Sequence, residues 1–288
     1  MKALVLASGA SHGAFQAGAL MAFDEIGYKP DIVLGCSVGA FNGAGYVSGL
    51  SGQQISELWK DLGTRDVFKW RPWREWFKVF SWNYVLDTSP LRNLIEDTLH
   101  LPSLYTADEL LLVSGVDIKT GRQKIFSSRI DETINPLRSY FEVNPLDYDS
   151  ILSSSAIPGI FPWVNGVWDG AFQQNNPLKP AVEMGATEIV VVHMNTVKDQ
   201  TALPKGIIET AHRIIEISSS YRLVSDVDLL RKRNDLPGFR DIDSLVISPS
   251  EPLSFSRLDF DAEEKKDAIN KGYDRAKQAM NNWKKGDA

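Results

Sequence analysis

Ser37 is the residue of this chain whose neighbours point most directly to chemistry. It lies in the sequence GCSVG, between Gly35 and Gly39. In this G-x-S-x-G pattern a serine occupies a sharp turn between a strand and a helix, and its hydroxyl is free to attack a carbonyl group. We expect the strand over residues 31–35 and the helix over residues 38–46. The pattern predicts a nucleophilic serine, and a structural turn with an incidental serine is the alternative.

A serine needs a group that stabilises the negative charge formed on the carbonyl oxygen it attacks. The loop SGASHG, residues 8–13, has small side chains and leads into a helix. Its backbone N–H groups can point toward an anion. A dinucleotide-binding loop is disfavoured, because Ser8 and Ala10 occupy two of its three glycine positions and no acidic residue ends the second strand.

The base that would remove the serine proton has two candidate positions. In the Ser, Asp or Glu, His order of α/β-hydrolases, His193 or His212 could complete a triad. His193 lies in the apolar run EIVVVHM and His212 lies in a predicted helix, so packing explains both more simply. Asp169 is the other candidate. It ends a predicted strand directly before Gly170, and a glycine allows the close approach of a hydroxyl to the carboxylate.

Three motifs in this order make the chain similar to the patatin-like phospholipases, lipid acyl hydrolases that use a Ser-Asp dyad. They are the small-residue loop, the G-x-S-x-G turn and the sequence Asp-Gly-Ala. The flanking stretches GAFQAGAL, SSAIPGIFP and NNPLKPAVEMGATEIVVV also resemble the family. The resemblance covers residues 1–194 and is weaker beyond them. It implies a three-layer α/β/α fold with a mainly parallel central sheet, in a single domain over residues 1–288 with a helical part at 206–288.

The resemblance also implies a role for each matching residue. Ser37 would be the nucleophile and Asp169 the general base, with no metal or cofactor. The implied oxyanion hole consists of Gly9, Ala10 and Ser11, and the supporting motif positions are His12, Gly13, Gly35, Gly39 and Gly170. The implied reaction is hydrolysis of fatty-acyl esters of phospholipids or lysophospholipids through an acyl-enzyme. A carboxylesterase or thioesterase acting on soluble esters is one alternative, and a catalytically weak lipid-binding module is another.

The loop departs from the family pattern G-G-G-x-R/K-G. Ser8 and Ala10 replace two glycines, which leaves the backbone amides in place, and His12 replaces the basic residue. An imidazole is only partly protonated near neutral pH, so His12 does not supply a fixed positive charge. It is either a weakened anion anchor or a loop histidine bonded to the backbone.

Strands and helices alternate around these motifs, which favours a parallel sheet covered by helices. We expect strands at residues 2–7, 31–35, 188–194 and 244–247, a hairpin of 110–118 with 123–127, and helices at 13–26, 38–46, 177–185, 206–233 and 262–284. Another helix begins after Ser89 as N-cap, with Pro90 in its first position, and a short helix is stopped by Pro158. Both glycine-bearing loops would lie beyond the carboxyl ends of the strands, where such sheets bind ligands.

Five of the eight tryptophans lie close together in the sequence: Trp59, Trp70, Trp73, Trp76 and Trp82. Basic residues outnumber acidic ones in the same stretch. Indole rings favour the membrane interface and basic side chains favour anionic head groups. Trp70, Trp73 and Trp76 are therefore candidates for peripheral membrane contact. A lid whose aromatic rings pack over the active site is the alternative, and it also fits a lipid substrate.

Composition narrows the partners and the compartment. The net charge of -6 gives no basic surplus for a nucleic acid. Cys36 is the only cysteine, which excludes an internal disulfide and favours a reducing compartment. No stretch reaches the ~18 apolar residues of a membrane-spanning helix, and the apolar run at residues 3–7 is shorter than the ~7–15 residues of a signal peptide. We expect a cytoplasmic protein, with peripheral membrane contact as its only contact with a bilayer.

Overall fold

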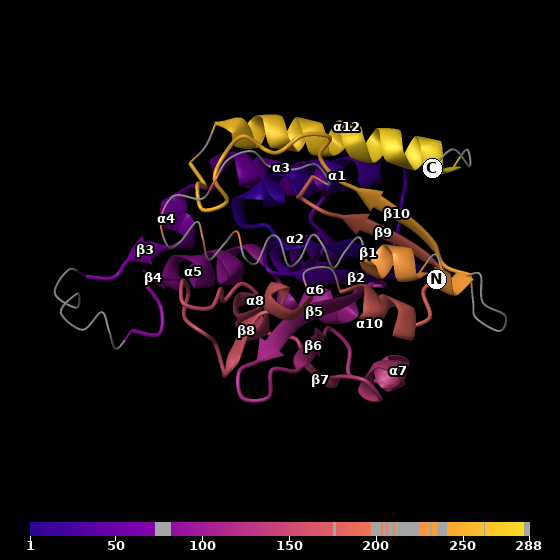
Figure 1. The fold of residues 1–288 in the computed structure, drawn as a ribbon, viewed down its shortest axis with the longest axis horizontal. Helices are drawn as coiled ribbons and strands as arrows, with labels where there is room; N and C mark the ends of the chain where they lie inside the picture. Colours follow the sequence, from indigo (N-terminus) through magenta and orange to yellow (C-terminus); the bar gives the residue numbers. More distant parts are fainter. Residues whose placement is uncertain are drawn as a thin grey trace.

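The computed structural model describes residues 1–72, 82–174, 177–196, 203, 206, 210, 213, 225–230, 232–234, 241–261 and 263–284. In this part of the chain one eight-stranded sheet has the order β10-β9-β1-β2-β5-β6-β7, and β8 also pairs with β5. The strand labels of Figure 1 follow this order from top to bottom. The mainly parallel sheet that the sequence predicts is thereby confirmed.

The parallel part of the sheet consists of β10 (Asp243–Ile247), β9 (Glu188–Val192), β1 (Lys2–Leu6), β2 (Ile32–Cys36) and β5 (Leu110–Asp117). Antiparallel pairing joins β5 to β6 (Gln123–Ser127) and to β8 (Val167–Asp169), and β7 (Glu142–Pro145) runs parallel to β6. A separate two-stranded hairpin is formed by β3 (Lys69–Trp70) and β4 (Leu86–Asp87).

Side chains of the central strands alternate between two apolar cores, one on each face of the sheet. In β1, Leu4 and Leu6 belong to the first core, whereas Ala3 and Val5 belong to the second. The first core is covered by α1 (Gly13–Glu25), α2 (Val38–Val47), α8 (Tyr148–Ser154) and α12 (Glu264–Lys284). The second is covered by α7 (Asn135–Arg138) and α10 (Leu178–Glu183). Burial on both faces explains why these strands are continuous apolar runs.

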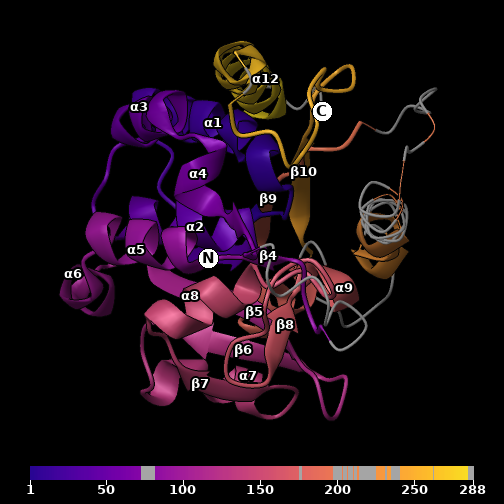
Figure 2. The ribbon, with the colours of Figure 1, turned by 90° about the vertical axis from the view of Figure 1, so that its left-hand side faces the viewer.

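The remaining described elements are short and lie between the strands: η1 (Ala10–His12), α3 (Gly52–Asp61), α4 (Thr64–Val67), α5 (Ser89–Thr98), α6 (Leu101–Thr106), η3 (Glu132–Ile134) and α9 (Ala171–Gln174). Viewed from the left-hand side of Figure 1, β4, β8 and α9 lie around the centre of one face (Figure 2). The carboxyl ends of β2 and β8 meet, because β2 runs parallel and β8 antiparallel to β5 and they pair with consecutive residues of it.

The C-terminal helix packs directly on the first helix. A Cβ on Gly18 of α1 would lie 1.9 Å from Ile269 O, and one on Gly272 of α12 would lie 1.9 Å from Phe15 O. The two helices therefore touch backbone to backbone, which only glycine allows at these positions. This contact places the connection between β10 and α12 next to the loop that follows β1.

Two sequence predictions need correction or restriction. α5 begins at Ser89 itself, its N-cap residue is Thr88, and Asp87 Oδ1 accepts the Ser89 N–H over 2.8 Å. The N-cap prediction for Ser89 is therefore wrong by one residue, because the preceding aspartate supplies the acceptor. Of the helix predicted at 206–233, the structure describes helical residues only at 210, 213, 225–230 and 232–234. His212, Trp73 and Trp76 lie outside the described residues.

Candidate active site

Ser37 lies at the sharp turn between β2 and α2. Its φ of 55° and ψ of −124° fall in a region that residues other than glycine rarely adopt. Neighbouring backbone leaves no room for side chains at the flanking positions. A Cβ on Gly39 would lie 2.1 Å from Leu6 O, and one on Gly35 would lie 2.5 Å from Gly39 O. The glycines thus allow α2 to pass the end of β1 so closely that the turn at Ser37 is forced.

Ser154, the last residue of α8, holds the backbone of this strained turn. The Ser37 N–H donates to Ser154 Oγ over 2.9 Å, and Ser154 Oγ donates to Ser114 O of β5 over 2.7 Å. Ser154 is fully buried. One hydroxyl therefore joins the nucleophile turn to the central strand without competition from water. Sequence reasoning missed this residue, because the serine run at 153–155 gives no sign of which hydroxyl points at the turn.

Strand register brings Asp169 to Ser37. Cys36, at the end of β2, pairs with Ser114, and Asp169, at the end of β8, pairs with the next residue of β5, Gly115. The two strand ends therefore face each other along one edge of β5. Ser37 follows Cys36 directly, so its side chain lies next to the Asp169 carboxyl group, and both residues line one cavity.

The Asp169 carboxyl group is almost completely enclosed, with only 4% of the residue exposed. Ala171 N–H donates to its Oδ1 over 2.8 Å, and the Cys36 thiol lies 3.8 Å from the same atom. Burial raises the pKa of Asp169 to about 6, while hydrogen bonds from Ala171, Ser37 and Cys36 oppose the rise. Burial and the Asp169 charge also raise the pKa of the Cys36 thiol, which stays protonated as a donor. The carboxyl group is thus ionised at neutral pH and more basic than an exposed aspartate.

Gly170 and Gly13, two other predicted motif positions, keep backbone segments in contact. A Cβ on Gly170 would lie 2.4 Å from Ser114 Oγ and 2.6 Å from Ser114 O. Gly170 is therefore required by β5, which differs from the expectation that it makes room for the serine hydroxyl. A Cβ on Gly13 would lie 2.4 Å from Val38 Cγ2 and 2.7 Å from Trp59 Cζ2. Gly13 thus lets α1 begin directly against α2 and α3.

The loop after β1 borders the same cavity as Ser37 and Asp169. The cavity is lined by Ser8, Gly9, Ala10, Ser37, Ile157, Pro158, Asp169, Ala171 and Phe172. No described residue accepts a hydrogen bond from the N–H groups of Gly9 or Ala10. Ser11 differs, because its N–H already donates to Arg257 O over 2.9 Å. The prediction of Ser11 as an oxyanion donor is therefore corrected, and Gly9 and Ala10 remain as candidates.

The connection between β10 and α12 holds this loop in place. Besides the bond from the Ser11 N–H, the Ser11 hydroxyl donates to Ser256 O over 3.0 Å. His12 Nε2 lies 2.9 Å from Phe255 O, and its ring meets the Phe255 ring edge-on at 4.8 Å. His12 is buried, so of its two interpretations the loop histidine bonded to the backbone applies. We call residues 255–257 the clamp segment.

Of the two histidines of the rival triad, the structure describes His193. His193 directly follows β9, is 3% exposed, and its N–H donates to Ile247 O over 2.9 Å. It does not line either described cavity that Ser37 borders. His212 lies outside the described residues. Of the candidate bases that the structure describes, Asp169 lines a cavity with Ser37 and His193 does not.

A separate, apolar pocket also borders Ser37, and Asp169 does not line it. It is lined mainly by aromatic and aliphatic side chains: Val38, Phe41, Trp59, Leu62, Val67, Leu91, Leu94, Ile157, Phe161 and Phe260. Its volume of about 40 Å³ is far below the range of about 300–1,000 Å³ typical of small-molecule sites. Phe260, which lines the pocket, packs on two other aromatic rings. Its ring centroid lies 6.3 Å from that of Trp59 and 6.4 Å from that of Phe68. The pocket is chemically suited to an acyl chain but nearly closed.

Trp59 is a core residue, which restricts the predicted aromatic surface. It is 1% exposed, and its Nε1 donates to Asn42 Oδ1 over 2.8 Å. Asn42 Nδ2 donates to Gly13 O and Gln16 Oε1, and Gln16 Nε2 donates to Ala7 O over 2.7 Å. This buried chain of amides fixes both ends of the loop at residues 8–13. Sequence reasoning missed it, because Gln16 and Asn42 look like ordinary helix residues.

Trp70 is the tryptophan of the predicted membrane surface that the structure describes. It is 57% exposed on β3, and the neighbouring Arg71 guanidinium lies 4.6 Å from the ring centroids of both Trp82 and Tyr84.

No helix among the described residues is long and apolar enough to cross a membrane. Within the same residues, no group of three or more His, Cys, Asp or Glu side chains is placed to hold a metal ion.

Comparison with known proteins agrees with this geometry. The model of a family described as "Patatin-like phospholipase" matches residues 4–182. The protein named Lysophospholipase NTE1 from Cryptococcus neoformans var. neoformans serotype D is 25% identical over 218 residues. Its namesake from Debaryomyces hansenii is 25% identical over 219 residues. Each match covers 70% of this chain but only 12% of the relative, so the chain corresponds to a small part of those proteins.

Two solved structures also resemble the fold. VipD from Legionella pneumophila is 14% identical, with 97% of this chain and 66% of that chain covered and a TM-score of 0.49. The type III effector protein ExoU is 14% identical, with coverage of 97% and 52% and a TM-score of 0.46. Because both TM-scores are below 0.5, we draw nothing about function from these two structures.

Proposed function

Because this chain belongs to the patatin-like phospholipase family, we propose that it hydrolyses fatty-acyl ester bonds of phospholipids or lysophospholipids with a dyad of Ser37 and Asp169. The observation that carries the proposal is that Ser37 and Asp169, which the register of β2 and β8 along β5 brings together, line one cavity with Gly9 and Ala10. A nucleophile, a base and donors for an oxyanion are the three parts that acyl transfer requires.

In the first half of the reaction, Asp169 accepts the Ser37 hydroxyl proton as Oγ attacks the ester carbonyl carbon. The carbonyl oxygen becomes an oxyanion, which the N–H groups of Gly9 and Ala10 stabilise. When the intermediate collapses, the alcohol leaves with the proton from Asp169, and the acyl group remains on Ser37. In the second half, Asp169 takes a proton from water, the hydroxide attacks the acyl-enzyme, and the fatty acid leaves as Ser37 regains its proton.

The apolar pocket beside Ser37 supports an acyl substrate over a polar one. A fatty-acyl chain gains roughly 0.8 kcal/mol for each CH₂ group that it buries. Since the pocket holds only about 40 Å³, a long chain requires side chains such as Phe260 to move. The names of the fungal relatives favour a lysophospholipid, in which one acyl chain must be accommodated. Exposed Trp70 supports peripheral contact with the surface that presents such a substrate.

The proposal is tested by hydrolysis of lysophosphatidylcholine with mass-spectrometric identification of the fatty acid and the alcohol. The Ser37→Ala variant, checked for folding by circular dichroism, should release neither. A soluble nitrophenyl butyrate ester serves as the parallel substrate. Turnover of the soluble ester alone would favour the carboxylesterase alternative. Binding of the lipid without turnover of either substrate would favour the lipid-binding module.

A further inference from the structure

A second and larger cavity lies behind α9, away from the candidate active site. It has a volume of about 680 Å³, within the range of about 300–1,000 Å³ typical of small-molecule sites. Its walls come from the turn between β5 and β6, the end of α7, the start of β7, and α9 and α10. Phe172 of α9 lines the active-site cavity, whereas the next residue, Gln173, lines this one. The two cavities are thus separated by one short helix.

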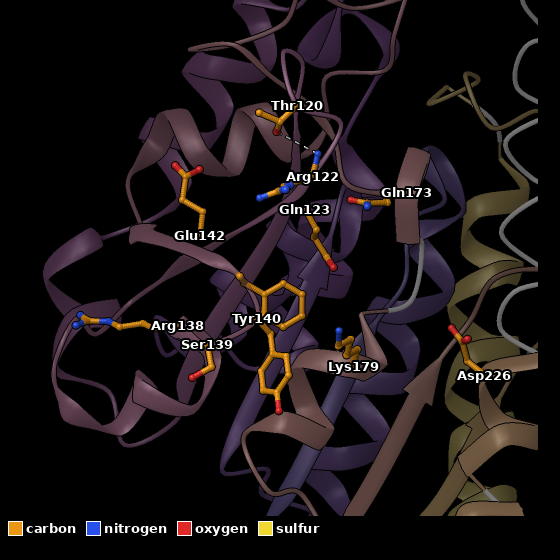
Figure 3. Close-up of a pocket in the computed structure, with 11 residues that line it drawn as sticks. Thr120, Arg122, Gln123, Arg138, Ser139, Tyr140, Glu142, Gln173, Lys179 and Asp226 are labelled. Carbon is orange, nitrogen blue, oxygen red and sulfur yellow. Dashed lines mark hydrogen bonds between the residues drawn. The ribbon is translucent and has the colours of Figure 1, made fainter.

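The polar groups of this cavity are mainly cations and amides. Figure 3 shows Gln123, Gln173 and Lys179 directed toward one hollow with Arg122 beside it, whereas Arg138 is directed away. No described carboxylate forms an ion pair with Arg122 or Lys179.

Neither of the two carboxylates at the rim forms an ion pair with Arg122 or Lys179. Glu142 is already ion-paired with Lys124 over 3.1 Å, and Lys124 also pairs with Asp117 over 3.1 Å. Asp226, on the opposite wall, has interactions of its own. Arg122 and Lys179 therefore carry charges for which no described carboxylate lies within ion-pair distance.

Lys179 is held without a carboxylate partner. Its Nζ lies 5.1 Å from the Tyr140 ring centroid and 5.5 Å from the Phe141 ring centroid. Cation–π contacts fix the position of the ammonium group while leaving its charge uncompensated by an anion. The exposed Tyr140 ring also offers apolar surface beside the charge.

We propose that this cavity binds a phosphate ester, with Arg122 and Lys179 contacting the phosphate group and Gln123 and Gln173 beside it. Phosphate favours arginine and lysine donors. The volume exceeds the need of inorganic phosphate, and the Tyr140 and Phe141 rings suit the organic part of an ester. The ligand is either a soluble phosphate ester or the head group of a phospholipid. This site does not depend on the hydrolase proposal, because none of its residues lines the cavity of Ser37.

The test is calorimetric titration of the intact protein with sn-glycerol 3-phosphate at low salt. We expect saturable binding that weakens by about 10-fold or more in the double variant Arg122→Gln, Lys179→Gln, since hydrogen bonds from charged donors to a phosphate are stronger than those from neutral ones. The double variant Lys29→Gln, Lys284→Gln makes the same charge change on exposed lysines elsewhere and should bind like the parent.

A second arm uses vesicles that contain an ether-linked phosphatidic acid, which the proposed hydrolase activity cannot cleave. Binding of the soluble ester that requires Arg122 and Lys179 identifies a soluble ligand. Binding of vesicles only, with the same requirement, identifies a lipid head group. The proposal fails if neither probe binds, or if both pairs of substitutions weaken binding equally.

Discussion

The nucleophile turn and the oxyanion loop lie in one cavity, but they are held in different ways. Ser37 is positioned mostly by its own neighbours, since Gly35 and Gly39 leave room only for the strand-to-helix turn. The loop at residues 8–13 is positioned from a distance, by the clamp segment at residues 255–257. The turn at Ser37 can therefore be predicted from neighbouring residues. The conformation of the oxyanion loop depends on the clamp segment, which lies more than 200 residues further along the chain.

The clamp segment also explains how the loop tolerates a residue with a side chain where the family has glycine. Ala10 has a φ of 49°, in the left-handed region that costs an L-residue about 1–2 kcal/mol. Hydrogen bonds from Ser11 to the clamp segment hold the chain in this conformation. The small-residue loop of this protein thus depends on tertiary contacts more than a glycine loop would.

The largest expected effect comes from removing the base that serves the nucleophile. Replacing Asp169 by Asn keeps the shape and the acceptor for Ala171 N–H but removes the proton acceptor. Hydrolysis should fall by about 10²–10⁴-fold, measured as kcat/KM on lysophosphatidylcholine. His193→Gln is the control and should change turnover only a few-fold. If His193→Gln abolishes hydrolysis in a folded protein while Asp169→Asn does not, the dyad is wrong.

The same substitution should stabilise the fold at alkaline pH. Burial raises the pKa of Asp169 in the folded protein to about 6, above the value of about 3.9 for an exposed aspartate, so the folded state binds the proton more tightly than the unfolded state. Below about pH 4, Asp169 is protonated in both states and does not lower the free energy of unfolding. As the pH rises through 6, its ionisation lowers the free energy of unfolding progressively. At pH 8 this buried charge costs on the order of 3 kcal/mol. Urea unfolding should show Asp169→Asn to be more stable than the parent at pH 8. A stabilisation equally large at pH 4 would contradict this account.

Ser154 tests whether the nucleophile turn is only locally determined. Ser154→Ala leaves the buried Ser37 N–H without its acceptor, which should cost about 1–3 kcal/mol and lower kcat about 10-fold with a smaller change in KM. Ser153→Ala is a matched control, because Ser153 is also buried but bonds only within α8, to Ser150 O over 2.8 Å. Equal kinetic losses in the two variants would show that Ser154 has no special role at the turn.

The smallest expected effect concerns the oxyanion loop. Ser11→Ala removes the bond to Ser256 O but keeps the bond from the Ser11 N–H to Arg257 O, so we expect a loss of about 0.5–1.5 kcal/mol. This should appear as a several-fold lower kcat and weaker binding of a phosphonate that mimics the tetrahedral intermediate. Ser56→Ala is the control, since the Ser56 hydroxyl is buried and has no hydrogen-bond partner among the described residues. Unchanged phosphonate binding in Ser11→Ala would mean that the clamp segment does not position the loop.

Several predictions succeeded because they rest on local geometry. The buried strands at β1, β2 and β9 are continuous apolar runs, and the turn at Ser37 follows from two glycines. Predictions about side-chain partners were less reliable. Ser11 was expected to donate into the oxyanion hole and instead donates to Arg257 O. Trp59 belongs to a surface-like aromatic stretch in the sequence, yet it is a core residue bonded to Asn42.

By itself the sequence determined the strands, the turn at Ser37 and the identity of Asp169 as a candidate base, because steric limits and apolar periodicity act over a few neighbouring residues. Only the tertiary structure decided that Cys36 and Asp169 pair with consecutive residues of β5, and that Ser154 binds the Ser37 N–H. It also decided that residues 255–257 hold the loop. Such hydrogen bonds join residues that lie far apart in the sequence. Their partners depend on strand register and helix packing, which a pattern of a few neighbouring residues does not predict.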